Sequence, residues 1–194
     1  MITSPYCTIG PYFPYDFVDG LEDLTHFNGI AAQGPRISIR GRVLEEGNRP
    51  TKNTILEIWQ PDARGIFRHP LDPRCSQADP GFRGWGRART DAQGDYRFLT
   101  VLPGGYSEAS PETSPLRRPH INVMILAIGL TRRLVTTIFF ADAPETVRDP
   151  VLDCVPEPAR RRLFAERQPS TGEIGEYAFD IVLRGENETP FFLD

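Results

Sequence analysis

Alternation of apolar and polar residues is the clearest pattern in this sequence, and it predicts strands. In residues 36–43 (RISIRGRV) every second position is apolar or small, as in a strand with one buried face. Residues 120–128 are apolar on both faces, which is typical of a central strand. Further strands are predicted at 54–60, 96–101, 134–140 and 177–183, with a short edge strand at 191–193.

Turn-forming residues separate these runs. The chain has 17 Gly and 19 Pro, and they lie between the apolar segments instead of in one tract. Residues 157–166 form the one helix that the sequence predicts, with Pro158 at its first turn. Residues 66–89 are interpreted as one long loop. The predicted fold is an all-β β-sandwich with long loops, one short helix and an extended N-terminal arm.

The first 35 residues look different from the rest. Pro and Gly break any period, but six aromatic residues are interleaved with them in the first 27 positions. We therefore expect residues 1–35 to be an arm that docks on a partner, and residues 36–194 to be a single β-sandwich domain.

Composition narrows the function classes. The 194 residues include 22 Lys and Arg and 26 Asp and Glu, which gives a net charge of −4. No nucleic-acid partner is therefore expected. No apolar run is long enough for a membrane span, and the first residues lack the features of a signal peptide. The three cysteines are scattered, which favours a reducing, cytoplasmic location.

The residues alone offer few candidates for a catalytic or metal-binding site. The three histidines, His26, His69 and His120, lack the spacing of a zinc site, and no phosphate loop, dinucleotide fingerprint or nucleophile elbow occurs. His120 and Asn122 are two apart, so they share one face of their strand. The simplest interpretation of His120 is a hydrogen-bonded core histidine.

Several short motifs nevertheless occur in a specific order along nearly the whole chain. They are TIGPY (8–12), LEIWQPD (56–62), GRARTD (86–91), PGGY (103–106), PHIN (119–122), FF (139–140) and GENET (185–189). With this set the sequence resembles the intradiol ring-cleavage dioxygenases. Within that family it is most similar to the α subunits of the protocatechuate 3,4-dioxygenases.

The resemblance implies a ferric site that is incomplete here. In the catalytic β subunits of the family, two tyrosines and two histidines hold Fe(III). The matching positions are Phe67, Tyr106, His120 and Asn122, so two of the four ligands are replaced. A phenyl ring donates nothing and an amide is a poor ligand for a hard cation. We expect no metal and no catalytic residue in this chain, and Fe(III) in a partner β subunit.

The resemblance also implies which residues line the substrate at the subunit junction: Thr8, Gly10, Pro11 and Tyr12 of the arm, and residue 128. Related α subunits have an arginine near the substrate carboxylate, and this chain has Ile128 in its place. Ile128 cannot pair with an anion, so either other groups bind the carboxylate or the catechol differs.

The leading hypothesis is therefore a non-catalytic α subunit of a hetero-oligomeric intradiol dioxygenase of aromatic catabolism. Its holoenzyme would cleave a protocatechuate-like catechol with O2 to a product of the 3-carboxy-cis,cis-muconate type, as in the β-ketoadipate pathway. Two alternatives stay open. One is a β-sandwich binding module for a small aromatic or a partner protein, and the other is a homomeric dioxygenase with an unusual metal shell.

Overall fold

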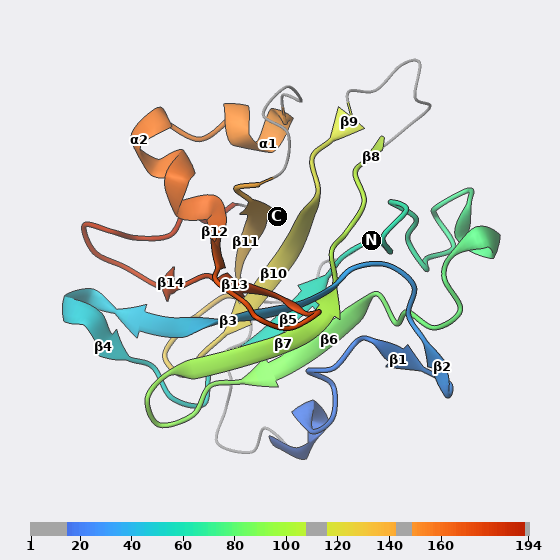
Figure 1. Cartoon of the computed structure of the whole chain (residues 1–194). Helices are drawn as coiled ribbons and strands as arrows, with labels where there is room; N and C mark the ends of the chain where they lie inside the picture. Colours follow the sequence, from blue (N-terminus) through green and yellow to red (C-terminus); the bar gives the residue numbers. More distant parts are fainter. Residues whose placement is uncertain (1–14, 108–115, 143–148, 193–194) are drawn as a thin grey trace, which may run out of the picture.

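Strands dominate the computed structural model, which describes residues 15–107, 116–142 and 149–192 (Figure 1). The main sheet contains β3 (Arg36–Glu45), β4 (Arg49–Pro50), β5 (Ile55–Trp59), β6 (Trp85–Arg89), β7 (Asp95–Val101), β10 (His120–Leu126), β11 (Leu134–Phe140), β12 (Phe164–Gln168), β13 (Gly175–Ala178) and β14 (Ile181–Val182). Two small hairpins are β1 (His26–Phe27) with β2 (Ile30–Ala31), and β8 (Tyr106–Ser107) with β9 (Leu116–Arg117). The all-β prediction is confirmed.

The helical segments are short. They are the α-helices α1 (Pro150–Asp153) and α2 (Glu157–Arg160), and the 3-10 turns η1 (Tyr15–Val18), η2 (Glu46–Asn48), η3 (Cys75–Gln77) and η4 (Arg161–Leu163). None of the helices in the described ranges has the length and apolar character needed to cross a membrane.

The sheet is continuous and curled, so its two halves form the two layers of the predicted sandwich. Its order is β14-β3-β13-β12-β11-β10-β5-β6, and β4 and β7 also pair with β3. The parallel contact of β12 with β11 and its antiparallel contact with β13 join the two halves. Buried side chains from both halves meet in one core; they include Ile39, Phe98, Tyr177, Ile58, Val123 and Ile138.

Alternation along β10 separates the core from the candidate site. Ile121, Val123 and Ile125 point into the core and are at most 1% exposed. His120 and Asn122 therefore point to the opposite face. There Asn122 lies opposite Trp59 of β5, and Trp59 lies opposite Trp85 of β6.

The helix predicted over 157–166 is wrong in its second half. The α-helix ends at Arg160, a 3-10 turn follows, and Phe164 begins β12. Phe164 and Ala165 pair in parallel with Phe139 and Phe140 of β11. This tertiary pairing overrides the helix propensity of the arginine-rich segment.

The loop predicted over 66–89 is also partly wrong, because Trp85–Arg89 forms β6 and pairs with β5. The small buried residues of β6, Gly86 and Ala88, do not produce the apolar alternation that marks a strand in a sequence. Gly86 is required by packing, since a Cβ there would collide with the Leu21 carbonyl and the Leu24 side chain.

The strand predicted over 177–183 is interrupted. β13 ends at Ala178 and β14 begins at Ile181. At the interruption Gly41 of β3 approaches the Phe179 carbonyl so closely that no Cβ would fit. The Asp180 carboxylate accepts the Arg42 amide at 2.8 Å and fills the gap in the ladder.

The described part of the N-terminal segment is not only loop, because it contains η1, β1 and β2. Leu24 is fully buried in the core, and its amide donates to the Leu99 carbonyl at 2.8 Å. Docking of the arm on a partner stays a prediction. At the other end, Phe192 forms a single bridge with Val135 where an edge strand was predicted.

Candidate functional site

The four expected ligand positions lie in one cluster at the end of β10. We call Phe67, Tyr106, His120 and Asn122 the ligand-position cluster. Three elements supply it: the loop after β5 carries Phe67, β8 carries Tyr106, and β10 carries both His120 and Asn122. Phe67, Tyr106 and His120 are far apart in the sequence, but the fold brings their rings together. The Phe67 and Tyr106 ring centroids are 4.9 Å apart, and those of Tyr106 and His120 are 5.3 Å apart.

Tyr106 and His120 share a polar contact. The Tyr106 hydroxyl lies 3.2 Å from Nε2 of His120. On the other side of the imidazole, Nδ1 donates to the Arg118 carbonyl at 2.6 Å, because a carbonyl can only accept. In the neutral ring Nε2 is then the acceptor for the Tyr106 hydroxyl. His120 is 1% exposed, as expected for a hydrogen-bonded core histidine.

Phe67 fills its position with hydrocarbon. Its ring meets Tyr106 edge to face and stacks on Trp59 with 6.0 Å between centroids and 14° between planes. The His69 ring also contacts Trp59, edge to face, with 5.7 Å between the ring centroids. The Phe67 position is therefore an aromatic packing site that contributes no donor atom.

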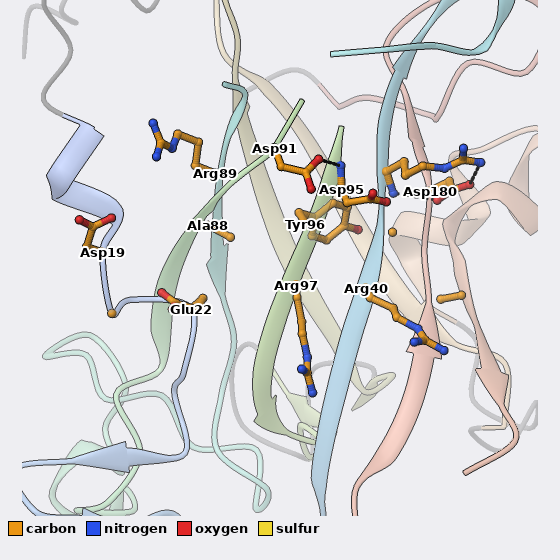
Figure 2. Close-up of a pocket in the computed structure, with 14 residues that line it drawn as sticks. Asp19, Glu22, Arg40, Ala88, Arg89, Asp91, Asp95, Tyr96, Arg97 and Asp180 are labelled. Atoms are coloured by element: carbon orange, nitrogen blue, oxygen red, sulfur yellow. Dashed lines mark hydrogen bonds and ion pairs between the residues drawn. The ribbon is translucent and has the colours of Figure 1, made fainter. Parts of the chain in front are cut away.

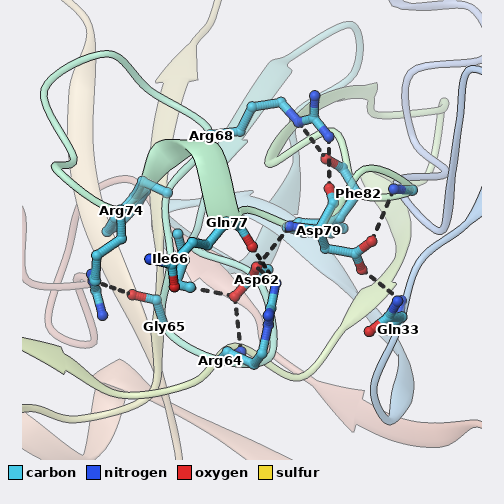
Figure 3. Close-up of polar contacts among 12 residues, drawn as sticks. Gln33, Asp62, Arg64, Gly65, Ile66, Arg68, Arg74, Gln77, Asp79 and Phe82 are labelled. Atoms are coloured by element: carbon cyan, nitrogen blue, oxygen red, sulfur yellow. Dashed lines mark hydrogen bonds and ion pairs between the residues drawn. The ribbon is translucent and has the colours of Figure 1, made fainter.

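The loop that carries Phe67 is held by a buried carboxylate, Asp62, which is 2% exposed (Figure 3). One oxygen accepts the amides of Arg64 at 2.8 Å and Ile66 at 3.1 Å, and the other accepts the Asp79 amide at 3.0 Å. Asp79 in turn accepts the amides of Gln33 and Gly81. Buried backbone amides need hydrogen-bond acceptors, and in this loop the two carboxylates take the role that the carbonyls of a neighbouring strand have in a sheet. They therefore hold the loop in one conformation.

A glycine contact fixes the loop against Tyr106. Gly65 has φ of +76°, and a Cβ there would overlap the Gly105 carbonyl. A Cβ on Gly104 would likewise collide with the backbone of residues 63–65. The Gly104 amide donates to the Asp62 carbonyl at 3.0 Å. These glycines let the turn before β8 press against the loop after β5, which sets the Phe67–Tyr106 distance.

A buried ion pair supports the other side of the cluster. Nε of Arg117 donates to Oδ2 of Asp149 at 2.9 Å, and the two side chains are 8% and 0% exposed. The same oxygen accepts the Arg118 amide, and Oδ1 caps α1 by accepting the Val151 amide. The guanidinium carbon of Arg117 lies 5.9 Å from the Tyr106 ring centroid. Asp149 thus ties the segment before His120 to α1.

The donor atoms of the cluster do not fit a four-ligand ferric site. Two ligands of one ion lie roughly 3 Å apart, so Tyr106 and His120 keep a suitable spacing. Phe67 offers no oxygen, however, and the Asn122 amide oxygen accepts the Thr137 hydroxyl at 3.1 Å. Within the described ranges, no three His, Cys, Asp or Glu side chains are grouped to hold a metal ion.

Of the predicted substrate-lining residues, the structure describes Ile128 alone, and it does not lie at this cluster. Thr8, Gly10, Pro11 and Tyr12 lie outside the described residues. Ile128 follows β10 at the end opposite to His120, beyond a strand that is itself about 20 Å long, and its side chain is 62% exposed. Any role of Ile128 toward a substrate therefore belongs to a surface distinct from the ligand-position cluster.

An open pocket of about 960 Å³ lies elsewhere, where the segment after η1 faces β3, β6 and β7 (Figure 2). Its labelled lining is charged with both signs: Asp19, Glu22, Arg40, Arg89, Asp91, Asp95, Arg97 and Asp180. None of the ligand-position residues lines it. The mixed charge gives no preference for one sign of ligand.

Sequence reasoning missed several residues that build the cluster. Asp149 is 32 residues from Arg117, so no local pattern links them. Asp62 was visible as part of the LEIWQPD motif, but its role as an amide acceptor appears only in the fold. The Trp59 side chain, which packs on Phe67, belongs to the same motif.

Comparisons with known proteins identify the family of the chain. A family model described as "Dioxygenase" (Dioxygenase_C) matches residues 9–185. The chain is 32% identical to the protocatechuate 3,4-dioxygenase alpha chain of Burkholderia cepacia, over 97% of this chain and 96% of that one. It is 42% identical to the beta chain from the same organism, over 81% of this chain and 68% of that one.

Solved structures show the same fold. The 3-chlorocatechol 1,2-dioxygenase of Rhodococcus opacus 1CP superposes with a TM-score of 0.62 at 19% identity, over 93% of this chain and 72% of that one. An intradiol ring-cleavage dioxygenase from Tetranychus urticae superposes with a TM-score of 0.58 at 22% identity, over 94% of both chains. With a family model that spans most of the sequence, the chain belongs to the intradiol dioxygenase family.

Proposed function

We propose that this chain is the non-catalytic α-type subunit of a hetero-oligomeric intradiol dioxygenase. The observation that carries the proposal is the donor set of the ligand-position cluster. Phe67 contributes only a ring packed between Tyr106 and Trp59, and the Asn122 oxygen is engaged by Thr137. One phenol and one imidazole are too few donors to hold a hard ferric ion against water.

The comparisons support the pairing of two kinds of chain. Both the alpha and the beta chain of protocatechuate 3,4-dioxygenase are similar to this chain, and the alignment with the alpha chain extends over nearly the full length of both. The higher identity to the beta chain would also suit a catalytic chain. The ligand positions Phe67 and Asn122 speak against that alternative.

In the proposed holoenzyme the partner β subunit holds Fe(III), and this chain supplies part of the wall of the substrate pocket at the junction. The reaction breaks the bond between the two hydroxyl-bearing ring carbons. Both atoms of O2 enter the product, and each of those carbons becomes a carboxyl carbon. With a protocatechuate-like substrate the product is of the 3-carboxy-cis,cis-muconate type.

Co-expression with an iron-binding β-type chain from the same source tests this function. We expect the two chains to co-purify and to consume oxygen with protocatechuate or a related catechol, while this chain alone consumes none. A chain that never associates with a β-type partner would instead be a binding module. Turnover of catechols by the isolated chain would contradict the non-catalytic role.

A further inference from the structure

The β1–β2 hairpin turns on an Asn-Gly pair at the periphery of the molecule (Figure 1). Asn28 has φ of +51° and Gly29 has φ of +77°, and Phe27 pairs with Ile30 across these two residues. Positive φ at both positions of a two-residue loop defines a type I′ turn, for which Asn-Gly is the preferred sequence. Asn28 and Gly29 are both exposed, and a Cβ on Gly29 would meet no described atom within 4 Å.

The same dipeptide is the one in which the main chain attacks an asparagine side chain most readily. Glycine has no side chain, so its nitrogen can approach the side-chain carbon of the preceding asparagine without a steric clash. Among the described residues, neither the Gly29 amide nor the Asn28 side chain makes a hydrogen bond that would hold it in place. Both reacting groups are therefore accessible to each other and to water.

The hairpin is small enough to open locally. The reaction needs rotation of the backbone at Asn28, and the two strands that oppose this rotation contain two residues each. A two-stranded hairpin of this size is marginally stable by itself, so few hydrogen bonds must break. Below the hairpin, the buried residues Thr25 and Ala32 are joined by a backbone hydrogen bond of 2.7 Å. Opening can therefore stay within residues 26–31.

The four other asparagines lack this combination of features. The residues that follow them all carry side chains, and they are Arg49, Thr54, Val123 and Glu188. The Thr54 amide donates to the Thr90 hydroxyl at 2.9 Å, and the Glu188 amide donates to the Gly185 carbonyl at 3.1 Å. Arg49 and Val123 lie in paired strands. The sequence and the structure thus single out Asn28.

We propose that Asn28 is a site of spontaneous deamidation, with water as the only co-reactant. The Gly29 nitrogen bonds to Cγ of Asn28 and gives up its proton, the Cγ–Nδ2 bond breaks, and ammonia leaves. Water then opens the resulting succinimide at one of its two C–N bonds. Opening at the bond to Cγ gives aspartate. Opening at the bond to the main-chain carbonyl carbon gives isoaspartate, whose main chain contains one additional carbon atom.

Isoaspartate at this position would disrupt the hairpin. The length of a two-residue turn fixes the register of its strands, so an added main-chain atom cannot keep Phe27 opposite Ile30. The Phe27 ring, which the guanidiniums of Arg68 and Arg83 approach to 5.0 and 5.7 Å, would then lose its fixed position. The reaction converts a neutral, ordered turn into a charged, open segment. This inference does not depend on the proposed function.

Peptide mapping by mass spectrometry after incubation of the purified chain at mildly alkaline pH measures conversion at each asparagine. We expect Asn28 to convert about tenfold faster than the other four asparagines, because side chains on the residues after those four hinder the attack. Methylation by an isoaspartyl methyltransferase measures the isoaspartate fraction. Conversion of Asn28 at the rate of the other asparagines would overturn the proposal, as would conversion confined to a sample unfolded in urea.

The matched control for the structural consequence is Asn28→Asp, which keeps a sequence that type I′ turns favour and has no ammonia to lose. Amide hydrogen exchange of a peptide covering residues 26–32 measures the order of the hairpin. Freshly purified Asn28→Asp should exchange like fresh wild type, whereas aged wild type that contains isoaspartate should exchange faster. Equal exchange of aged and fresh wild type would show that the hairpin survives the modification, and that part of the inference would be wrong.

Discussion

The Tyr106 hydroxyl lies 3.2 Å from Nε2 of His120, at a spacing that two ligands of one metal ion would also show. What differs from a metal site is the surroundings of this pair. The Phe67 ring stands 4.9 Å from Tyr106 where a second phenol oxygen would be needed. The pair would supply two of the four donors that the family resemblance implies, and the other two positions hold an aromatic ring and an amide whose oxygen accepts the Thr137 hydroxyl.

Restoring the two replaced donors should create a metal site. We expect the double variant Phe67→Tyr with Asn122→His to bind ferric iron and to show the visible absorption of tyrosinate bound to iron. The backbone needs little change, because Tyr106 and His120 already have the spacing of ligands. Metal analysis after reconstitution with ferric iron, together with visible spectra, measures the result.

The single variants are the matched controls for this prediction. Each supplies three donors and should hold iron more weakly than the double variant. An unchanged iron content in all three variants would show that the cluster cannot open to admit an ion. The donor-set argument would then be incomplete, since packing would also exclude the metal.

The buried Arg117–Asp149 pair should be costly to break. Asp149→Ala leaves a buried guanidinium without its carboxylate, removes the Arg118 amide acceptor and uncaps α1. Loss of one partner of a buried ion pair costs about 3–5 kcal/mol of unfolding free energy. Urea unfolding measures it. Glu157→Ala, which breaks the exposed Glu157–Arg160 pair, is the control and should cost less than about 1 kcal/mol.

Asp62 should control the order of the loop that carries Phe67. Asp62→Ala leaves buried amides of Ile66 and Asp79 without acceptors, each costing about 1–3 kcal/mol. We expect a lower unfolding free energy and faster proteolytic cleavage between residues 62 and 82. Asp62→Asn keeps one acceptor oxygen and should lose less. Equal protease resistance of wild type and Asp62→Ala would show that the loop is held by other contacts.

Alkaline pH should destabilise the fold through buried tyrosines. Burial, with the hydrogen bond to Asp142 and its charge, raises the pKa of Tyr177 from its usual 10.0 to about 12. The unfolded chain loses this proton near pH 10 and the folded chain does not, so the unfolding free energy falls as pH rises from 10 to 12. Burial also raises the pKa of Tyr96, in the same direction.

The matched variant is Tyr177→Phe, which removes one of the protons involved. Its unfolding free energy at pH 9 and pH 11 should differ by less than that of wild type. The measurement is a series of urea titrations at these two pH values. An identical alkaline loss in both proteins would mean that Tyr177 titrates normally in the folded state.

The strands were predictable where one face of the sheet is apolar and the other polar. Residues 36–43 and 96–101 lie in strands of the structure, and their alternation reflects burial on one face. Residues 134–140 also form a strand, but its last five residues are all buried, so the apolar and β-branched run marks it instead of alternation. β6 was missed because its inward positions are Gly86 and Ala88, which fill a tight space without adding an apolar signal. β12 was missed because its pairing with β11 depends on residues far away in the sequence.

The candidate site was predictable only through the family resemblance. His120 and Asn122 share a face by strand periodicity, but nothing local links them to Phe67 or Tyr106. Their meeting depends on the Gly65–Gly105 approach and on the Asp62 network, which are properties of the folded chain.

Iron content and visible absorption of the purified chain, measured alone and in complex with a β-type partner, test the central claim most directly. The account predicts no stoichiometric iron and no tyrosinate-to-iron band for the chain alone after incubation with ferric iron, and one iron per pair of chains in the complex. Stoichiometric iron with that band in the isolated chain would contradict it.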